Sequence, residues 1–213
     1  MGAVRLIPSR YPVVGLLDRV ASPDDLPALY ELEAWTNDRI SNELGILHTI
    51  PREEWVIGRP MASVIMAAFC HPSPDGGRFN SPDRGAWYAA RTLETSIAES
   101  VHRRTQELRE VGGLETRVQM RVYLADFRAA FHDIRERKKS WEALYNPDDY
   151  TASQTFARHL MASASNGIVY RSVRHAGGEC LACFGPALVL NVRVGGHYEF
   201  RWEGRPEPII KKA

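Results

Sequence analysis

The segment Leu-Glu-Thr-Arg-Val-Gln-Met-Arg-Val-Tyr-Leu, residues 114–124, alternates between apolar and polar side chains. A period of two residues is typical of a half-buried β-strand. One face would carry Leu114, Val118, Met120, Val122 and Leu124. The other would carry Glu115, Arg117, Gln119, Arg121 and Tyr123, which we expect to face solvent. This strand sets the frame for the elements on both sides of it.

A helix is predicted before this strand and a hairpin after it. Thr92 can cap a helix from Leu93 to about Leu108, whose Ile97 and Val101 fall on one apolar stripe. On the other side, residues 187–194 and 197–202 are typical of two strands joined by a turn at Gly195-Gly196. Further patterns predict a helix from Ser22-Pro23-Asp24-Asp25 to about Leu44, helices at 60–69, 141–145 and 151–163, and strands at 86–90 and 167–172.

These elements mix without the regular alternation of a parallel α/β fold. The predicted class is therefore α+β, with mixed, mainly antiparallel sheets and flanking helices. The chain has 213 residues, of which 44% are hydrophobic and 25% charged. That composition is ordinary for a globular protein, and we expect one domain over 1–213 with a helical elaboration at about 22–70. No apolar run approaches a membrane span and no signal peptide is evident, so we expect a cytoplasmic protein.

The charge balance argues against nucleic acid or an anionic membrane as the partner. The formal net charge is only +1. Positive charge is concentrated in residues 100–140, most densely at Arg135, Arg137, Lys138 and Lys139. This stretch is either a solvated face or an edge that binds anions or a partner. Nucleic-acid binding by it is the weakest of the functions considered.

Three cysteines, Cys70, Cys180 and Cys183, do not make a disulfide framework, because their number is odd and no secretion signal accompanies them. Cys180 and Cys183 form a C-x-x-C motif near His175. A zinc site would need two more ligands at a suitable spacing, and none stands out. We therefore expect a buried strand here and no metal, and leave a redox role of the two cysteines open.

Four polar residues stand at the edges of predicted elements: Arg78 after two glycines, Tyr88, Glu99 and Ser172. Ser172 lacks the Gly-x-Ser-x-Gly setting of a hydrolase nucleophile, and no phosphate-binding P-loop is present. The four residues belong to segments that occur in a distinctive order: Gly-Gly-Arg-Phe-Asn (76–80), Trp-Tyr-Ala-Ala (87–90), Glu-Thr-Ser-Ile-Ala-Glu-Ser-Val-His (94–102), Tyr-Thr-Ala-Ser-Gln (150–154) and Gly-Ile-Val-Tyr-Arg-Ser-Val-Arg (167–174).

Together these segments resemble the RES domain, a family named for an Arg, a Glu and a Ser. Its characterised members are toxins of bacterial toxin–antitoxin pairs that destroy NAD, with a core similar to ADP-ribosyltransferases. The resemblance covers roughly residues 1–10 and 70–190, with Phe79 where many relatives have Trp. It implies that Arg78, Tyr88, Glu99 and Ser172 are catalytic, and that Arg5, Arg78, Tyr88 and Ser172 contact NAD.

The chemistry of NAD cleavage suits these residue types. Breaking the N-glycosidic bond passes through an oxocarbenium-like state, which a carboxylate such as Glu99 can stabilise. Arg5 and Arg78 offer planar forks for phosphate oxygens. Tyr88 offers a ring for stacking, and Ser172 offers a hydroxyl that orients the amide or a phosphate. His102, Gln154 and Arg174 are weaker candidates; His102 follows Glu99 on nearly the same helix face and either supports the site or packs.

The resemblance thus implies a type II toxin that depletes NAD by hydrolysis or phosphorolysis of the nicotinamide bond. The alternatives are a mono-ADP-ribosyltransferase that modifies a protein, and a non-catalytic interaction module that retains the fold. NAD would be consumed as a substrate, with no cofactor or metal. The implied partner is an Xre-type antitoxin, and homo-oligomerisation stays open.

Overall fold

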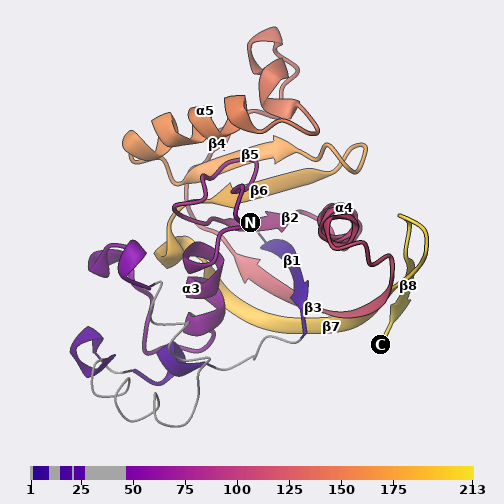
Figure 1. Ribbon diagram of the computed structural model, residues 1–213. Coiled ribbons are helices and arrows are strands. Elements are labelled where there is room, and N and C mark those ends of the chain that lie inside the picture. The colour runs from indigo at the N-terminus through magenta and orange to yellow at the C-terminus, as the bar shows by residue number, and fades with distance from the viewer. Residues whose placement is uncertain (1, 10–14, 21, 27–46) are drawn as a thin grey trace.

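The computed structural model describes residues 2–9, 15–20, 22–26 and 47–213 (Figure 1). In these ranges, eight strands form one sheet in the order β4-β5-β6-β2-β1-β3-β7-β8. Their bounds are β1 (Gly2–Pro8), β2 (Trp87–Ala90), β3 (Glu115–Asp126), β4 (His132–Asp133), β5 (Gly167–Arg171), β6 (Glu179–Cys183), β7 (Leu190–Glu203) and β8 (Ile209–Lys212). Every neighbouring pair is antiparallel except β4 and β5, which are parallel. The α+β prediction is confirmed.

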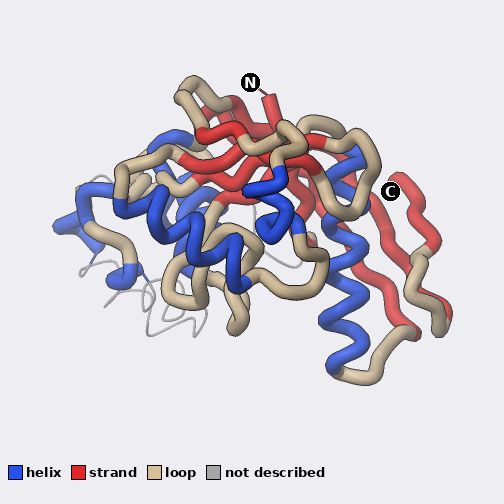
Figure 2. Tube along the Cα trace, turned by 90° about the horizontal axis from the view of Figure 1, so that it is seen from above, coloured by secondary structure: helices blue, strands red, loops and turns tan. Residues whose placement is uncertain are grey.

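The described helices accompany this sheet on both faces (Figures 1 and 2). They are α3 (Ala62–Cys70), α4 (Leu93–Glu110), α5 (Thr151–Ala162) and the 3-10 helices η1 (Leu16–Asp18), η2 (Pro23–Asp25), η3 (Leu47–Thr49), η4 (Arg52–Glu54), η5 (Lys139–Tyr145) and η6 (Pro186–Leu188). The helices predicted at 60–69, 93–108 and 151–163 correspond to α3, α4 and α5. No helix within the described ranges is long and apolar enough to cross a membrane.

The predicted helix start at Ser22 is present as a complete capping box. The Ser22 hydroxyl accepts a hydrogen bond from the Asp24 N–H, and the Asp25 carboxylate accepts one from the Ser22 N–H. The turn that it caps is η2. The rest of the helix expected to reach Leu44, residues 27–44, lies outside the described residues.

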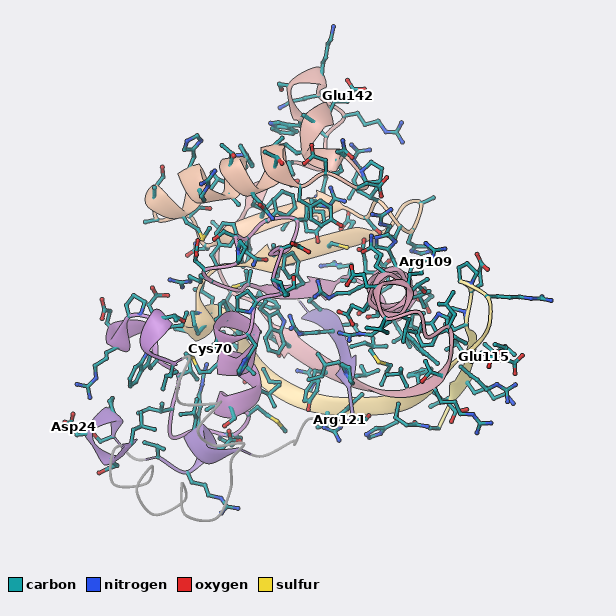
Figure 3. The ribbon with its side chains drawn as sticks, in the orientation of Figure 1. Asp24, Cys70, Arg109, Glu115, Arg121 and Glu142 are labelled. Carbon is teal, nitrogen blue, oxygen red and sulfur yellow. The ribbon has the colours of Figure 1, made fainter. Side chains whose placement is uncertain are left out.

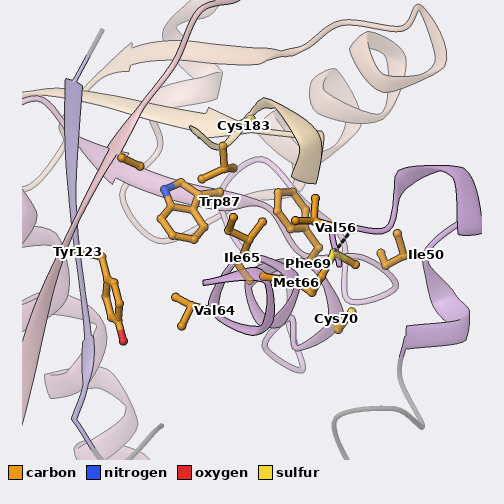
Figure 4. Close-up of a cluster of buried hydrophobic side chains, with 14 of the residues drawn as sticks. Ile50, Val56, Val64, Ile65, Met66, Phe69, Cys70, Trp87, Tyr123 and Cys183 are labelled. Atoms are coloured by element: carbon orange, nitrogen blue, oxygen red, sulfur yellow. Dashed lines mark hydrogen bonds between the residues drawn. The ribbon is translucent and has the colours of Figure 1, made fainter. Parts of the chain in front are cut away.

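Strand β3 lies near the middle of the sheet, between β1 and β7. Met120 and Val122 are buried on the face covered by α4, as the alternation predicts. The prediction that Tyr123 faces solvent is wrong: its side chain is 0% exposed. Tyr123 belongs to the apolar cluster that α3 completes on the opposite face, where Figure 4 shows it beside Val64. The second half of β3 is therefore buried on both faces.

The predicted hairpin turn at Gly195-Gly196 is also wrong, because β7 runs unbroken from Leu190 to Glu203. Its pairing with β3 shifts register at the glycines: Val194 faces Tyr123, whereas His197 faces Arg121. This irregularity absorbs one extra residue as a β-bulge. A side chain at Gly195 would place its Cβ 2.9 Å from Val122 Cγ1, so glycine permits the close approach.

One seam in the sheet positions the candidate site. Strand β1 pairs with β3 along its whole length, from Gly2 opposite Asp126 to Pro8 opposite Met120. On its other side β1 pairs with β2 only where Val4 faces Ala90. Beyond Val4 the two strands diverge, as Figure 1 shows, and residues 5–8 of β1 line a cavity.

Candidate active site

The cavity at this seam measures about 610 Å³, a size typical of sites for small molecules. Its walls come from β1, α3, the loop at 71–80, β2, α4 and the start of α5. Arg5, Arg78, Tyr88 and Glu99 all line it, although they are far apart in the sequence. Ser172 does not line the cavity; it lies behind Glu99.

Helix α4 delivers Glu99 to the cavity. The Thr92 hydroxyl caps the helix by accepting a hydrogen bond from the Thr95 N–H at 3.3 Å, as predicted. Residues three and four apart on a helix share one face. That face of α4 carries the cavity-lining residues Ser96, Glu99, Ser100 and Arg103. The opposite stripe, with Ile97 and Val101, packs on the sheet.

Ser172 holds the Glu99 carboxylate. Its hydroxyl lies 2.6 Å from Glu99 Oε1 and also accepts hydrogen bonds from the N–H groups of Arg174 and His175, at 3.1 and 2.9 Å. Because a hydroxyl has one proton, that proton is donated to Glu99. The Cys180 thiol lies 3.8 Å from the same carboxylate oxygen. The position of Glu99 Oε1 is thus fixed by the Ser172 hydroxyl and the Cys180 thiol.

Tyr88 organises the glycine-containing loop. Its hydroxyl accepts a hydrogen bond from the Phe79 N–H and donates one to Asn80 Oδ1, both at 2.8 Å. Burial raises the pKa of Tyr88, so the phenol stays protonated. A Cβ at Gly77 would lie 2.7 Å from the Tyr88 hydroxyl and 2.5 Å from Asn80 Oδ1. Gly77 is therefore required for this network to close.

Arg78 makes structural hydrogen bonds that the amino-acid sequence did not predict. It is only 8% exposed, and its Nη1 donates to the carbonyls of Leu144 and Asn146 at 3.0 and 2.7 Å. Its guanidinium carbon lies 4.6 Å from the centre of the Tyr150 ring, which also lines the cavity. Arg78 therefore ties the loop to the C-terminal end of η5, and it also lines the cavity.

Arg5 lies on β1, and its side chain lines the cavity. Its Nη1 donates to the Tyr88 carbonyl at 3.1 Å, and its guanidinium carbon lies 4.8 Å from the Trp87 ring. Burial, together with the nearby positive charges of Arg103 and Arg104, lowers the pKa of Arg5 to about 10. The guanidinium of Arg5 stays charged at neutral pH, although Arg103 and Arg104 place further positive charge near it.

His102 and Gln154, the weaker candidates, have different roles in the geometry. His102 lines the cavity, and its Nε2 is buried with no hydrogen-bond partner among the described residues. Burial, reinforced by Arg174, lowers the pKa of His102 to about 4, so the imidazole is neutral at pH 7. Gln154 does not line the cavity; its amide donates to the carbonyls of Asp75 and Gly77. Gln154 therefore supports the loop.

The cysteines are buried and free, and Cys180 and Cys183 lie on the predicted strand, β6. Burial raises the pKa of each thiol. Within the described ranges, no three His, Cys, Asp or Glu residues come together as a metal site would require. Cys180 nevertheless reaches the cavity wall.

Two of the four basic residues at 135–139, Arg135 and Lys138, form ion pairs. Arg135 forms ion pairs with Asp133 and Glu179, at 2.7 and 2.8 Å. Lys138 pairs with Glu136 at 2.6 Å and lies over the Trp141 ring. η5 projects beyond α5, where Figure 3 labels Glu142. For Arg135 and Lys138, these contacts favour the solvated-face interpretation over an anion-binding edge.

The sequence analysis did not single out several residues that the structure adds to the site. The α4 residues Ser96, Ser100 and Arg103 could have been found, because helical spacing from Glu99 places them on its face. Asn80 and Tyr150 belong to the ordered segments 76–80 and 150–154, but no local pattern predicted their place at the cavity, which depends on how loops fold against it.

The fold and the site define a class: an α+β protein with a small-molecule cavity between diverging strands, lined by one fixed carboxylate and several arginines. The family model of the RES domain matches residues 46–203, and the chain belongs to this family. Arg78, Tyr88, Glu99 and Ser172 fall within the match, whereas Arg5 lies outside it.

Two known proteins are similar to the chain. It is 27% identical over 203 residues to the uncharacterized protein y4oC of Sinorhizobium fredii, covering 94% of this chain and 82% of that protein. The crystal structure of the M. tuberculosis MbcT–MbcA toxin–antitoxin complex aligns over 59% of this chain and 72% of that chain. The TM-score is 0.44 and the identity 18%.

Proposed function

We propose that the protein is a toxin that depletes NAD by cleaving the bond between nicotinamide and ribose. Membership of the RES family, whose characterised members destroy NAD, suggests the substrate. The observation that carries the proposal is the Glu99 carboxylate, which Ser172 holds at 2.6 Å in a cavity that arginines line. NAD is then a substrate, not a resident cofactor.

The proposed reaction needs charge stabilisation more than proton donation. As the C1′–N bond breaks, its electron pair moves to the nicotinamide nitrogen, which leaves neutral. Positive charge then develops on the ribose, next to Glu99. A water or phosphate oxygen forms the new bond to C1′, and water releases a proton in doing so. A preorganised charge of this kind lowers the activation free energy by about 3–4 kcal/mol. Because the leaving group departs neutral, the low pKa of His102 does not impede the reaction.

The test is nicotinamide release from NAD by purified protein, with Glu99→Gln as the key variant. We expect this variant to be roughly 10²–10³-fold slower, because the amide is neutral. Glu110→Gln is the matched control, since Glu110 is exposed at the end of the same helix and outside the cavity. Equal rates for the Glu99→Gln variant and the wild type would overturn the proposal.

The acceptor separates this proposal from the alternatives. Adding phosphate distinguishes phosphorolysis, which yields nicotinamide and ADP-ribose 1″-phosphate, from hydrolysis, which yields nicotinamide and ADP-ribose. Release of nicotinamide only when protein substrates are added, with label passing from NAD to protein, would indicate mono-ADP-ribosyl transfer. No release under any condition, together with no effect of Glu99→Gln in cells, would indicate a non-catalytic module.

We propose that the protein acts in the cytoplasm, where its substrate is, and that an Xre-type antitoxin neutralises it. This step rests on the family resemblance. Induced expression of the chain alone should stop growth while cellular NAD falls, and the Glu99→Gln variant should do neither. Co-expression of a neighbouring Xre-type protein should restore growth. Growth arrest without a fall in NAD would contradict this role.

A further inference from the structure

Three arginines line the same cavity as Glu99: Arg5 on β1, and Arg103 and Arg104 on α4. They are neighbours because α4 packs on β1, with Leu6 of β1 and Val101 of α4 in one apolar cluster. The positive charges of Arg103 and Arg104 both act on Arg5. The group therefore concentrates positive charge on one wall.

A single carboxylate contacts both α4 arginines. Glu107 Oε1 lies 3.1 Å from Arg103 Nε, and Glu107 Oε2 pairs with Arg104 Nη1. Glu107 itself does not line the cavity, so it holds the two side chains from outside. The polar contact of Arg5 is a neutral carbonyl, that of Tyr88. A wall that gathers three guanidinium groups suits an anionic ligand such as a phosphate.

We propose that Arg5, Arg103 and Arg104 form a phosphate subsite that holds the diphosphate of the dinucleotide or a free phosphate acceptor. The inference rests on the proposed function for its substrate, and it adds the two α4 arginines to the site. It also moves phosphate recognition away from Arg78, whose Nη1 is already bonded to two carbonyls.

The spacing along α4 supports this assignment. Glu99 and Arg103 are four residues apart on one face, so they are separated by about 6 Å along the helix axis. A ribose whose C1′ lies beside Glu99 can direct its 5′-phosphate toward Arg103. Arg103 is 48% exposed and Arg104 is 22% exposed, so the subsite lies at the open side of the cavity, where a charged ligand can enter.

The experiment compares Arg103→Met/Arg104→Met with the wild type, because methionine retains the apolar stem and removes the charge. Arg109→Met is the matched control: Arg109 is exposed on the same helix, outside the cavity (Figure 3). Binding of inorganic pyrophosphate and of NAD is measured by calorimetry, with NAD binding measured in the Glu99→Gln background to prevent turnover. Circular dichroism confirms that each variant is folded.

We expect the double variant to bind pyrophosphate at least tenfold more weakly, since each charge-assisted hydrogen bond contributes that much or more. A parallel loss for NAD, but none for nicotinamide riboside, identifies the diphosphate as the ligand. Loss of phosphate-stimulated nicotinamide release, with NAD binding intact, identifies free phosphate. Unchanged pyrophosphate binding in the double variant overturns the subsite. Weakened pyrophosphate binding in a protein that does not bind or cleave NAD would retain the subsite and reject the proposed function.

Discussion

The hydroxyl of Ser172 donates a 2.6 Å hydrogen bond to Oε1 of Glu99, joining the turn after β5 to the middle of α4 across 73 residues of sequence. The same hydroxyl accepts two backbone N–H groups, which fixes its orientation. Ser172 is therefore a positioning residue in this structure. It leaves the second oxygen of Glu99 available to the cavity.

Replacing Ser172 tests this positioning role. Ser172→Ala should lower kcat for NAD cleavage about tenfold, since a hydrogen bond to a charged group contributes roughly 1.5–3 kcal/mol, while KM changes little. Ser172→Thr retains a hydroxyl and should restore most of kcat. A Ser172→Ala variant with wild-type kcat, or a threonine variant as slow as the alanine one, would show that the hydroxyl does not position Glu99.

Tyr88→Phe should destabilise the protein through the loop at 76–84. The hydroxyl satisfies the Phe79 N–H and Asn80 Oδ1, and its removal leaves buried polar groups without partners. We expect the free energy of unfolding in urea to fall by about 1–3 kcal/mol. Tyr198→Phe, on β7 outside the cavity, is the control and should change it far less. Equal stabilities of the two variants would refute the loop-organising role of Tyr88.

Gly77→Ala should weaken the affinity for NAD while leaving the secondary-structure content unchanged. The added Cβ would lie within 2.8 Å of both Asn80 Oδ1 and the Tyr88 hydroxyl, at 2.5 and 2.7 Å, so the loop must shift at the cavity wall. Gly113→Ala is the matched control, because the nearest atom to its Cβ is Val111 Cγ2 at 3.7 Å. Calorimetry in the Glu99→Gln background measures the difference. Wild-type affinity in the Gly77→Ala variant would contradict the prediction.

His102 should make the fold sensitive to mild acid. Its pKa is lowered from 6.5 to about 4, by burial first and then by Arg174 and Arg78, with Asp148 opposing them. Below pH 6.5 the unfolded chain therefore takes up a proton that the folded protein refuses, so stability falls between pH 6.5 and 4 and levels off below 4. Above pH 6.5 this contribution is complete.

The measurement is the thermal midpoint as a function of pH for the wild type, His102→Asn and the control His159→Asn. His159 is exposed on α5. The His102→Asn variant should lose less stability than the wild type over this window, whereas the control should follow the wild type. Identical slopes for all three proteins would show that His102 is not held neutral by the fold.

Much of the secondary structure could be predicted because its signals are local. The Thr92 cap and the apolar stripe of α4 lie within one helix, and the alternation of β3 lies within one strand. The Gly195-Gly196 pair also has a strong local signal for a turn, but the continuous ladder between β7 and β3 overrides it. The prediction that Tyr123 faces solvent is wrong for a similar reason: its burial depends on α3, from a distant part of the chain.

Some members of the candidate site could be predicted from the sequence, but their contacts could not. Arg78, Tyr88 and Glu99 were identified from ordered segments, and all three line one cavity. The bond between Ser172 and Glu99 depends on how β6 pairs with β2 on one side and with β5 on the other, which no local pattern encodes. Likewise, the carbonyls that occupy Arg78 come from 66 and 68 residues further along.

The seam between β1 and β2 also governs when the pocket can exist during translation. During synthesis, β1 must wait for β3 before it has a partner along its length, and β2 must wait for β6. Ser172 emerges between these events. A nascent chain that ends before Cys183 therefore lacks part of β6, the strand that pairs with β5 beside Ser172, whose hydroxyl holds Glu99. The assembled pocket can therefore form only after β6 has been synthesised.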